Sequence, residues 1–161
     1  ICKLSFKIIH SSTLLLPAWV VTLKDLGMPV KMIPRDVSTR WNSLFDLANF
    51  ICKHETAIES ITDKQKLKMT DLALDAHEWV LLRQLRDILK DATLFFSCGT
   101  PNLPMVLPAM DYIDEAFTNG ILKKEVLDPA IRTAIGLGKK TLNRYYSKTD
   151  TSDLYRIAMG K

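Results

Sequence analysis

Apolar residues recur along most of the chain at alternating steps of three and four, which is the period of an amphipathic helix. The sharpest stripe predicts a helix from about Ser43 to Ile61, with His54 set inside the apolar face. Its positions are Leu44, Leu47, Ile51, His54, Ile58 and Ile61. A wider stripe after Asp75 predicts a long helix that packs against several others. Its positions are Leu81, Leu82, Leu85, Ile88, Leu89, Ala92, Phe95 and Phe96.

Residues that favour helix ends lie at the limits of these patterns. Asp75, with Glu78 three positions later, predicts a capping box at the start of the long helix. Asp128 followed by Pro129 predicts the start of another helix, because proline suits the first helical position. We expect that helix to reach about Tyr146.

The chain before Ser43 predicts two short helices and an extended connector. Residues 4–26 carry a helical pattern that is broken near Ser11, and Gly27 is a suitable stop. Two prolines within residues 28–34 hold that stretch out of a helix. It predicts a connector with at most one short strand.

These elements indicate an all-α fold, an irregular helical array. A further helix is expected over residues 104–118, with Asn119 and Gly120 as its stop. The polar, lysine-rich residues 62–70 suggest a surface loop and a boundary between two parts. We therefore expect one part over residues 1–61 and a second over 62–161.

Composition agrees with a helical, core-forming chain and says little about partners. Of the 161 residues, 47% are hydrophobic, and six glycines and seven prolines are few for this length. The net charge of +4 is a mild bias toward anionic partners. The three cysteines form no CxxC pair, which favours a reducing, intracellular setting over a disulfide framework.

Several patterns resemble catalytic or metal sites without meeting their requirements. Gly138-Lys139 lacks the glycine that a phosphate-binding loop needs five positions earlier, where the chain has Thr133. The three histidines have no second ligand at helical spacing, so we expect His54 to be a packed core or boundary residue. The chain also lacks the sequence signature of a catalytic serine or cysteine.

A group of carboxylates leaves two interpretations open. Asp111 with Asp114 or Glu115 shares a helix face and could serve acid–base or metal chemistry. The same residues are also typical of the solvated side of an amphipathic helix, opposite Met110, Ile113 and Phe117.

A basic stripe is expected on the helix that follows Pro129. Its members recur at multiples of four, with one adjacent lysine: Arg132, Lys139, Lys140, Arg144 and Lys148. Such a stripe could face DNA phosphates, or it could be the solvated side of the helix. We include these residues among the candidate DNA contacts.

Polar groups, cations and a large aromatic ring meet where the connector joins the next helix. Trp41 offers a flat face on which a base could stack, and a base pulled out of a duplex needs such shelter. The other candidate DNA contacts here are Arg35, Thr39, Arg40, Asn42 and Ser43. The alternative is a tryptophan that fills the core beside an ordinary helix cap.

This segment resembles the Asp-x-x-Thr-Arg-Trp-Asn-Ser signature of hAT-superfamily DNA transposases. The matching residues are Asp36, Thr39, Arg40, Trp41, Asn42 and Ser43. The downstream order is similar too, and the resemblance covers essentially the whole chain. It extends over Glu78-Trp79, Leu85, Ile88, Leu89, residues 92–97, residues 101–103 and residues 106–113.

The resemblance implies a helical edge of a ribonuclease-H-like core followed by part of an inserted helical domain. In the family, three acidic residues hold a divalent metal that drives cleavage of DNA. The resemblance places those acids before and after this chain, together with a zinc-dependent DNA-binding domain and a dimerisation segment. Trp41 matches the family residue that stabilises a flipped base.

We therefore expect a transposase fragment that engages the ends of a transposon but lacks the cutting residues. It would bind no cofactor of its own, no membrane and no small-molecule substrate. It would act in the nucleus, and its homo-oligomerisation would need the missing C-terminal region. The alternatives are a transposon-derived, non-catalytic DNA-binding or chromatin-associated protein and a helical protein-interaction domain.

Overall fold

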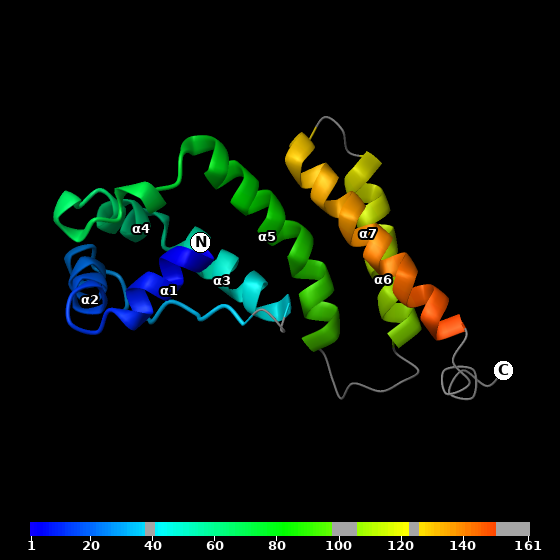
Figure 1. Ribbon diagram of the computed structural model, residues 1–161, viewed down its shortest axis with the longest axis horizontal. Coiled ribbons are helices and arrows are strands. Elements are labelled where there is room, and N and C mark those ends of the chain that lie inside the picture. Colours follow the sequence, from blue (N-terminus) through cyan, green and yellow to red (C-terminus); the bar gives the residue numbers. More distant parts are fainter. Residues whose placement is uncertain (38–40, 98–105, 123–125, 151–161) are drawn as a thin grey trace. The chain divides into compact units, whose positions relative to one another are not determined.

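A computed structural model describes residues 1–37, 41–97, 106–122 and 126–150, and the expected all-α fold is confirmed. That part of the chain forms helices and contains no strand (Figure 1). The α-helices are α1 Cys2–His10, α2 Leu15–Asp25, α3 Trp41–Lys53, α4 Glu55–Thr62, α5 Ala76–Ser97, α6 Val106–Leu122 and α7 Pro129–Asp150. Two short 3₁₀ helices are η1 Gln65–Leu67 and η2 Thr70–Leu72.

The chain divides into two compact units, Ile1–Arg86 and Asp87–Lys161. The division falls inside α5, so the polar residues 62–70 belong to the first unit. Met69, within that stretch, is fully buried. The assignment of residues 1–61 and 62–161 to two parts of a transposase stays a prediction.

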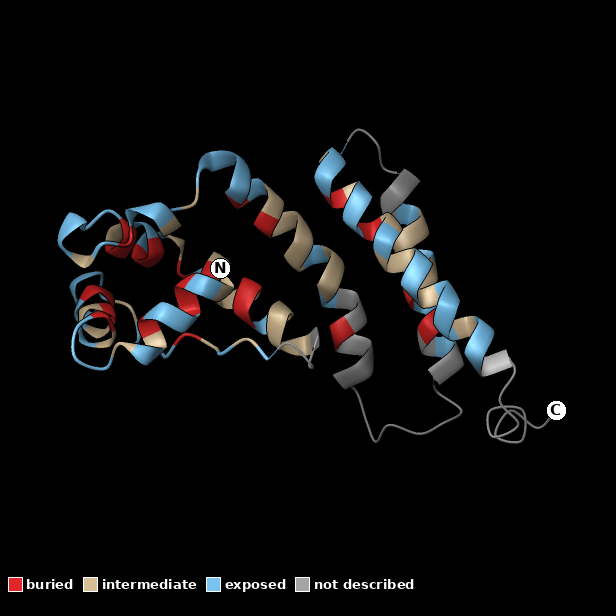
Figure 2. Cartoon of the chain, viewed as in Figure 1, coloured by how far each residue is buried: buried red, intermediate tan, exposed pale blue. Residues whose placement is uncertain are grey.

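The first unit is built around one apolar core to which every helix from α1 to α5 contributes (Figure 2). Burying these side chains is the main stabilising contribution to this unit. They are Leu4, Ile8, Leu15, Trp19, Leu23, Ile33, Leu47, Ala48, Ile51, Ala57, Ile58, Ile61, Met69, Trp79 and Leu82.

Helix α2 ends as the sequence predicts. Gly27 adopts a φ of 66° and its N–H donates to the Lys24 carbonyl. The N–H of Met28 donates to the Leu23 carbonyl, which completes a Schellman motif. The left-handed conformation that this motif needs is accessible to glycine without strain.

The connector that follows is held extended by two buried side chains. The Trp19 indole Nε1–H donates to the Lys31 carbonyl at 2.9 Å, and the Ser5 hydroxyl donates to the Pro34 carbonyl at 2.7 Å. These bonds satisfy backbone groups that a sheet partner would otherwise need to bind. The connector is therefore positioned against α1 and α2 without forming a strand.

The single helix expected from Ser43 to Ile61 is wrong, because His54 divides it into α3 and α4. The His54 ring stacks on Phe50 at 3.9 Å between centroids, and its Nδ1 lies 2.8 Å from the Phe50 carbonyl. That carbonyl also accepts the backbone N–H of His54. The apolar stripe still faces the core, and His54 is buried at the boundary as expected.

Helix α5 begins with the expected capping box. The Glu78 N–H donates to the Asp75 carboxylate at 2.7 Å, and the Asp75 N–H donates to the Glu78 carboxylate at 3.0 Å. Two side chains of the next turns, Trp79 and Leu82, enter the core of the first unit. The expected end of this helix near Gly99 lies outside the described residues.

In the second unit, α6 and α7 lie side by side and antiparallel (Figure 1). Asp128 caps α7, because its carboxylate accepts the Ala130 N–H at 2.8 Å. The expected stop of α6 at Asn119 and Gly120 is wrong, since the helix continues to Leu122. Glycine lowers helix propensity but does not end a helix on its own.

Gly138 lets α6 and α7 approach each other closely. A methyl group at this position would lie 3.1 Å from Cε2 of Phe117 on α6. A methyl group at Gly136 would meet nothing within 4 Å. Close packing of the two helices therefore depends on a glycine at position 138 and not at position 136.

Among the described residues, no single helix is long and apolar enough to cross a membrane. Helices α1 and α2 meet the length and composition for a span only as a pair, and the chain bends by 104° between them.

Candidate nucleic-acid interface

The connector is tied to the first turn of α3 by Ser43. Its hydroxyl lies 3.0 Å from the Asp36 carboxylate and 3.0 Å from the Val37 carbonyl, and it accepts the Val37 N–H at 2.9 Å. Asp36 and Ser43 are the two ends of the signature segment. Their contact brings these two ends together beside Trp41, the first residue of α3.

Of the other candidate DNA contacts at this junction, the structure describes the side chains of Arg35 and Asn42. Arg35 is exposed on the connector. Asn42 is half-buried, and its Oδ1 is buried without a hydrogen-bond partner in the described structure. Thr39 and Arg40 lie outside the described residues, as does the side chain of Trp41.

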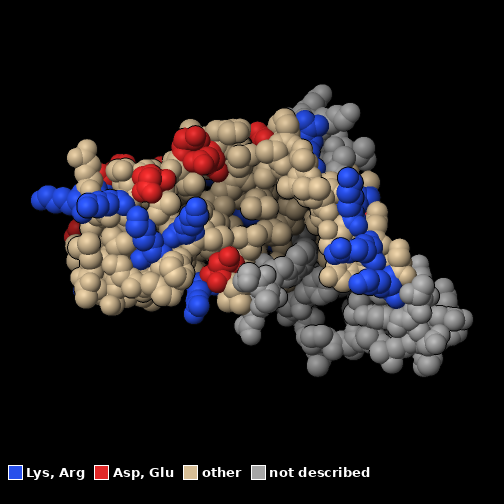
Figure 3. All heavy atoms as spheres, viewed as in Figure 1, with Lys and Arg blue, Asp and Glu red and all other residues tan. Residues whose placement is uncertain are grey.

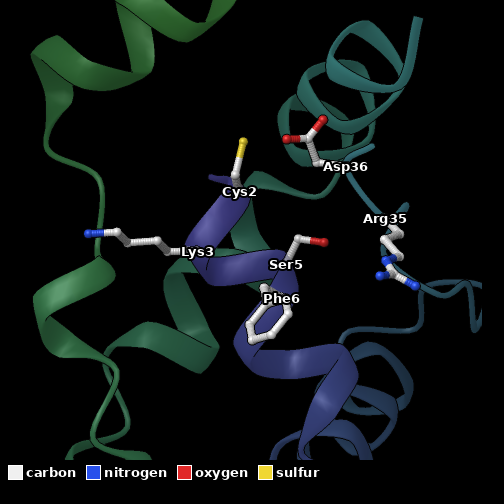
Figure 4. A pocket seen from close by; sticks show the side chains of 6 residues that line it. All are labelled: Cys2, Lys3, Ser5, Phe6, Arg35 and Asp36. Carbon is white, nitrogen blue, oxygen red and sulfur yellow. The ribbon is translucent and has the colours of Figure 1, made fainter. Parts of the chain in front are cut away.

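A hollow lies beside the junction, between α1 and the connector (Figure 4). Cys2, Lys3, Ser5, Phe6, Arg35 and Asp36 line it. Burial and the neighbouring Asp36 carboxylate raise the pKa of the Cys2 thiol, which keeps the thiol protonated and neutral. The charged groups of the hollow are therefore Lys3, Arg35 and Asp36.

Three members of the expected basic stripe are exposed on α7, namely Lys140, Arg144 and Lys148. Figure 3 shows Lys and Arg side chains following this helix. The guanidinium of Arg144 and the ammonium of Lys148 lie 5.7 and 5.8 Å from the centroid of the Tyr145 ring. Tyr145 is exposed and extends this basic surface with an aromatic ring. Sequence reasoning missed it because a single tyrosine carries no periodic signal.

The other two members of the stripe are turned toward the protein. The Lys139 ammonium binds α6, at 3.2 Å from the Asp114 carboxylate and 2.5 Å from the Thr118 hydroxyl. Arg132 is half-buried, with its Nε enclosed. Three of the five cations are therefore exposed, and the other two are half-buried against the protein.

The carboxylates of α6 make contacts with α7. Asp114 binds Lys139, and Asp111 accepts a hydrogen bond from the Tyr146 hydroxyl. Burial and the Asp111 carboxylate raise the pKa of Tyr146 above its ordinary value. Neither interpretation left open for this group included these contacts. Asp111 and Asp114 help to hold the two helices together.

Metal-binding geometry is not found in the part of the chain that the structure describes. No group of three or more His, Cys, Asp or Glu side chains there could hold an ion. His54 packs against Phe50, and the ring of His10 stacks on Phe6. The described histidines of α1 and of the α3–α4 boundary are thus engaged with neighbouring aromatic rings.

The junction lies in the first unit and the α7 surface in the second. Comparisons of the chain with models of known protein families, with curated proteins and with solved structures give no match.

Proposed function

We propose that this chain is part of a hAT-type DNA transposase and that it contributes DNA binding rather than DNA cleavage. The observation that carries the proposal is the hydrogen bond from the Ser43 hydroxyl to the Asp36 carboxylate, because these residues are the first and last of the family signature. The two polar ends of the signature bind each other, and Trp41 follows at the start of a helix. The resemblance gives this tryptophan the role of stacking on a flipped base.

The local chemistry supports such a role. The first N–H groups of a helix have no partner within it and carry partial positive charge, so they favour a nearby phosphate. Arg35 adds an exposed cation a few residues before the helix. A nucleotide could thus find a phosphate contact and an aromatic face at one place.

The exposed surface of α7 would supply further, sequence-independent contacts. Lys140, Arg144 and Lys148 offer positive charge, and Tyr145 lies among them. Contacts of this kind position a protein on DNA without reading its sequence. We assign no metal ligand to this chain, because the resemblance places the metal-binding acids outside it.

The remaining parts of the proposal follow from the family. A transposase acts on chromosomal DNA, which implies a nuclear protein. Its assembly into homo-oligomers would use a C-terminal region beyond these residues. A transposon-derived, non-catalytic DNA-binding protein would use the same two surfaces, and intact catalytic acids in the flanking gene sequence would distinguish the two.

The decisive experiment compares the chain with Trp41→Ala on a fluorescent DNA hairpin and on a matched duplex. We expect micromolar or tighter binding to the hairpin that weakens with salt, and a loss of about 1–3 kcal/mol on the substitution. Trp41→Phe is the matched control, since it keeps an aromatic face. Circular dichroism establishes that each variant is folded.

Two results would overturn the proposal. The first is absence of hairpin binding by the folded chain. The second is unchanged hairpin binding when Trp41→Ala lowers the thermal midpoint, because the tryptophan would then be a core residue of a helical interaction domain.

The α7 surface has its own test. Replacing Lys140, Arg144 and Lys148 with glutamine should weaken duplex binding on all sequences alike. It should also lower the slope of log affinity against log salt by about 0.9 for each phosphate contact removed. Lys139→Gln serves as the comparison, because that ammonium is bound to α6. An unchanged slope in the triple variant would show that the stripe is only a solvated helix face.

A further inference from the structure

An exposed aromatic ring on α1 has no part in the proposed function. The Phe6 side chain is 59% exposed, although phenylalanine is among the residues most often buried. Its ring stacks on His10 at 3.9 Å between centroids, with the planes inclined by 26°. His10 is itself anchored, because its Nδ1 lies 2.8 Å from the Phe6 carbonyl. The pair therefore presents a supported aromatic face to solvent.

Cations flank this ring on both sides. Lys3 lies on α1 and Arg35 on the connector, and both line the same hollow as Phe6. Figure 4 shows Phe6 between them, with the two charged groups extending to opposite sides. Lys7, one helical turn after Lys3, is held in place because its ammonium donates to the Lys68 carbonyl at 2.9 Å. Positive charge therefore continues along α1 past the ring.

Among the residues that line the hollow, Asp36 alone carries a negative charge, against the two cations Lys3 and Arg35. The Cys2 thiol is neutral, and the Ser5 hydroxyl is used by the Pro34 carbonyl. Asp36 is the one acid that lines the hollow, and its carboxylate accepts a hydrogen bond from Ser43. The same bond links the hollow to the first turn of α3. A DNA strand bound in the hollow would therefore lie next to the start of that helix.

We propose that Lys3, Phe6 and Arg35 form a binding site for single-stranded DNA. Phe6 stacks on one unpaired base, while Lys3 and Arg35 hold the phosphates on its two sides. Single strands suit this arrangement because an aromatic side chain reaches the face of a base only when the base is unpaired. The proposal rests on the proposed function for the choice of DNA as the partner, but it concerns residues outside the signature.

The test is a titration of the full chain with a short single-stranded oligonucleotide that contains 2-aminopurine, whose fluorescence falls when the base stacks. We expect quenching on binding, and Phe6→Ala should remove the quenching and weaken binding at least about fivefold. Phe6→Tyr should preserve both. Lys3→Gln and Arg35→Gln should each lower the salt slope by about 0.7.

Val21→Ala is the control for a general loss of apolar surface, because Val21 is 51% exposed on α2 of the same unit. Two outcomes overturn the site. One is unchanged affinity and quenching in folded Phe6→Ala. The other is equally tight binding of poly-glutamate with the same dependence on Phe6, which would indicate an acidic protein partner.

The Phe6→Ala and Trp41→Ala experiments test the α1 site and the proposed function separately. If Trp41→Ala abolishes hairpin binding while Phe6→Ala leaves single-strand binding unchanged, the proposed function stands and the α1 site falls. If Phe6→Ala abolishes single-strand binding while Trp41→Ala changes nothing, the α1 site stands without the transposase proposal.

Discussion

The two units of the chain are both helical, yet different interactions hold their helices together. In Ile1–Arg86, large side chains such as Trp19, Leu23 and Ile51 are fully buried, and two polar side chains bind the connector backbone. In Asp87–Lys161, the buried apolar side chains of the described α6 and α7 residues form a narrower seam. These are Met110, Ile113, Ile131 and Ile135.

Polar contacts join the helices in both units, and in the first unit Arg83 of α5 binds Glu55 of α4. Lys139 binds Asp114 and Thr118 across the α6–α7 pair, and Tyr146 binds Asp111. Burial of apolar surface is insensitive to charge, whereas exposed and half-exposed ion pairs weaken with salt and with changes of protonation. The comparison teaches that the larger core of the first unit should respond most to lost volume, whereas the narrower α6–α7 seam should respond more to the loss of its polar contacts.

The largest expected effect is the loss of the Trp19 side chain. Trp19→Ala should lower the free energy of unfolding by about 3–5 kcal/mol, because it leaves a cavity and removes the hydrogen bond to the Lys31 carbonyl. Urea unfolding followed by circular dichroism measures it. Val21→Ala, on an exposed position of the same helix, should stay within about 0.5 kcal/mol. Equal losses in both variants would contradict a core centred on Trp19.

A smaller effect is expected from Lys139→Met, which keeps the apolar stem but removes the charge bound to α6. We expect a loss of about 1 kcal/mol at low salt and less at 1 M salt, where the Debye length is only about 3 Å. Thermal unfolding at the two salt concentrations measures it. Lys140→Met is the neighbouring exposed control. A loss that is the same at both salt concentrations would speak against an electrostatic origin.

The two glycines of α7 should respond in different degrees to the same substitution. Gly136→Ala should raise the free energy of unfolding by about 0.5–1 kcal/mol, because alanine favours the helix and the added methyl group meets open space. Gly138→Ala should gain less, since its methyl group presses on Phe117 at 3.1 Å. Thermal midpoints of the two variants test this. A larger gain at Gly138 would refute the close approach of α6 and α7.

The smallest effect is a pH dependence at Tyr146. Burial and Asp111 raise its pKa above the ordinary value of 10.0, so the folded chain holds this proton more tightly than the unfolded chain. The stability that results is present below pH 10 and is lost as the pH rises beyond it. Tyr146→Phe should reduce the fall in thermal midpoint between pH 9 and pH 11. The same fall in both proteins would assign it to other groups, the lysines above all.

Sequence reasoning reached part of the candidate interface. It placed the signature at the entry to a helix and Lys140, Arg144 and Lys148 on one exposed face, because both follow from local spacing. It grouped Lys139 with them, although adjacent helical residues point about 100° apart. The partner of Lys139 is on another helix, and the exposure of Phe6 depends on the connector and α1. Neither could be deduced from neighbouring residues.

The sequence by itself determined where several helices begin and end. The capping pair Asp75–Glu78, the Asp128 cap and the Gly27 stop act through bonds that span at most five residues, so their effect is local. Tertiary structure decided the rest. His54 interrupts a continuous apolar stripe and lies beside Trp19 of α2, with 6.2 Å between ring centroids, and Met69 is buried inside a lysine-rich stretch. Both depend on surfaces supplied by distant parts of the chain, because burial and packing are set by which helices meet.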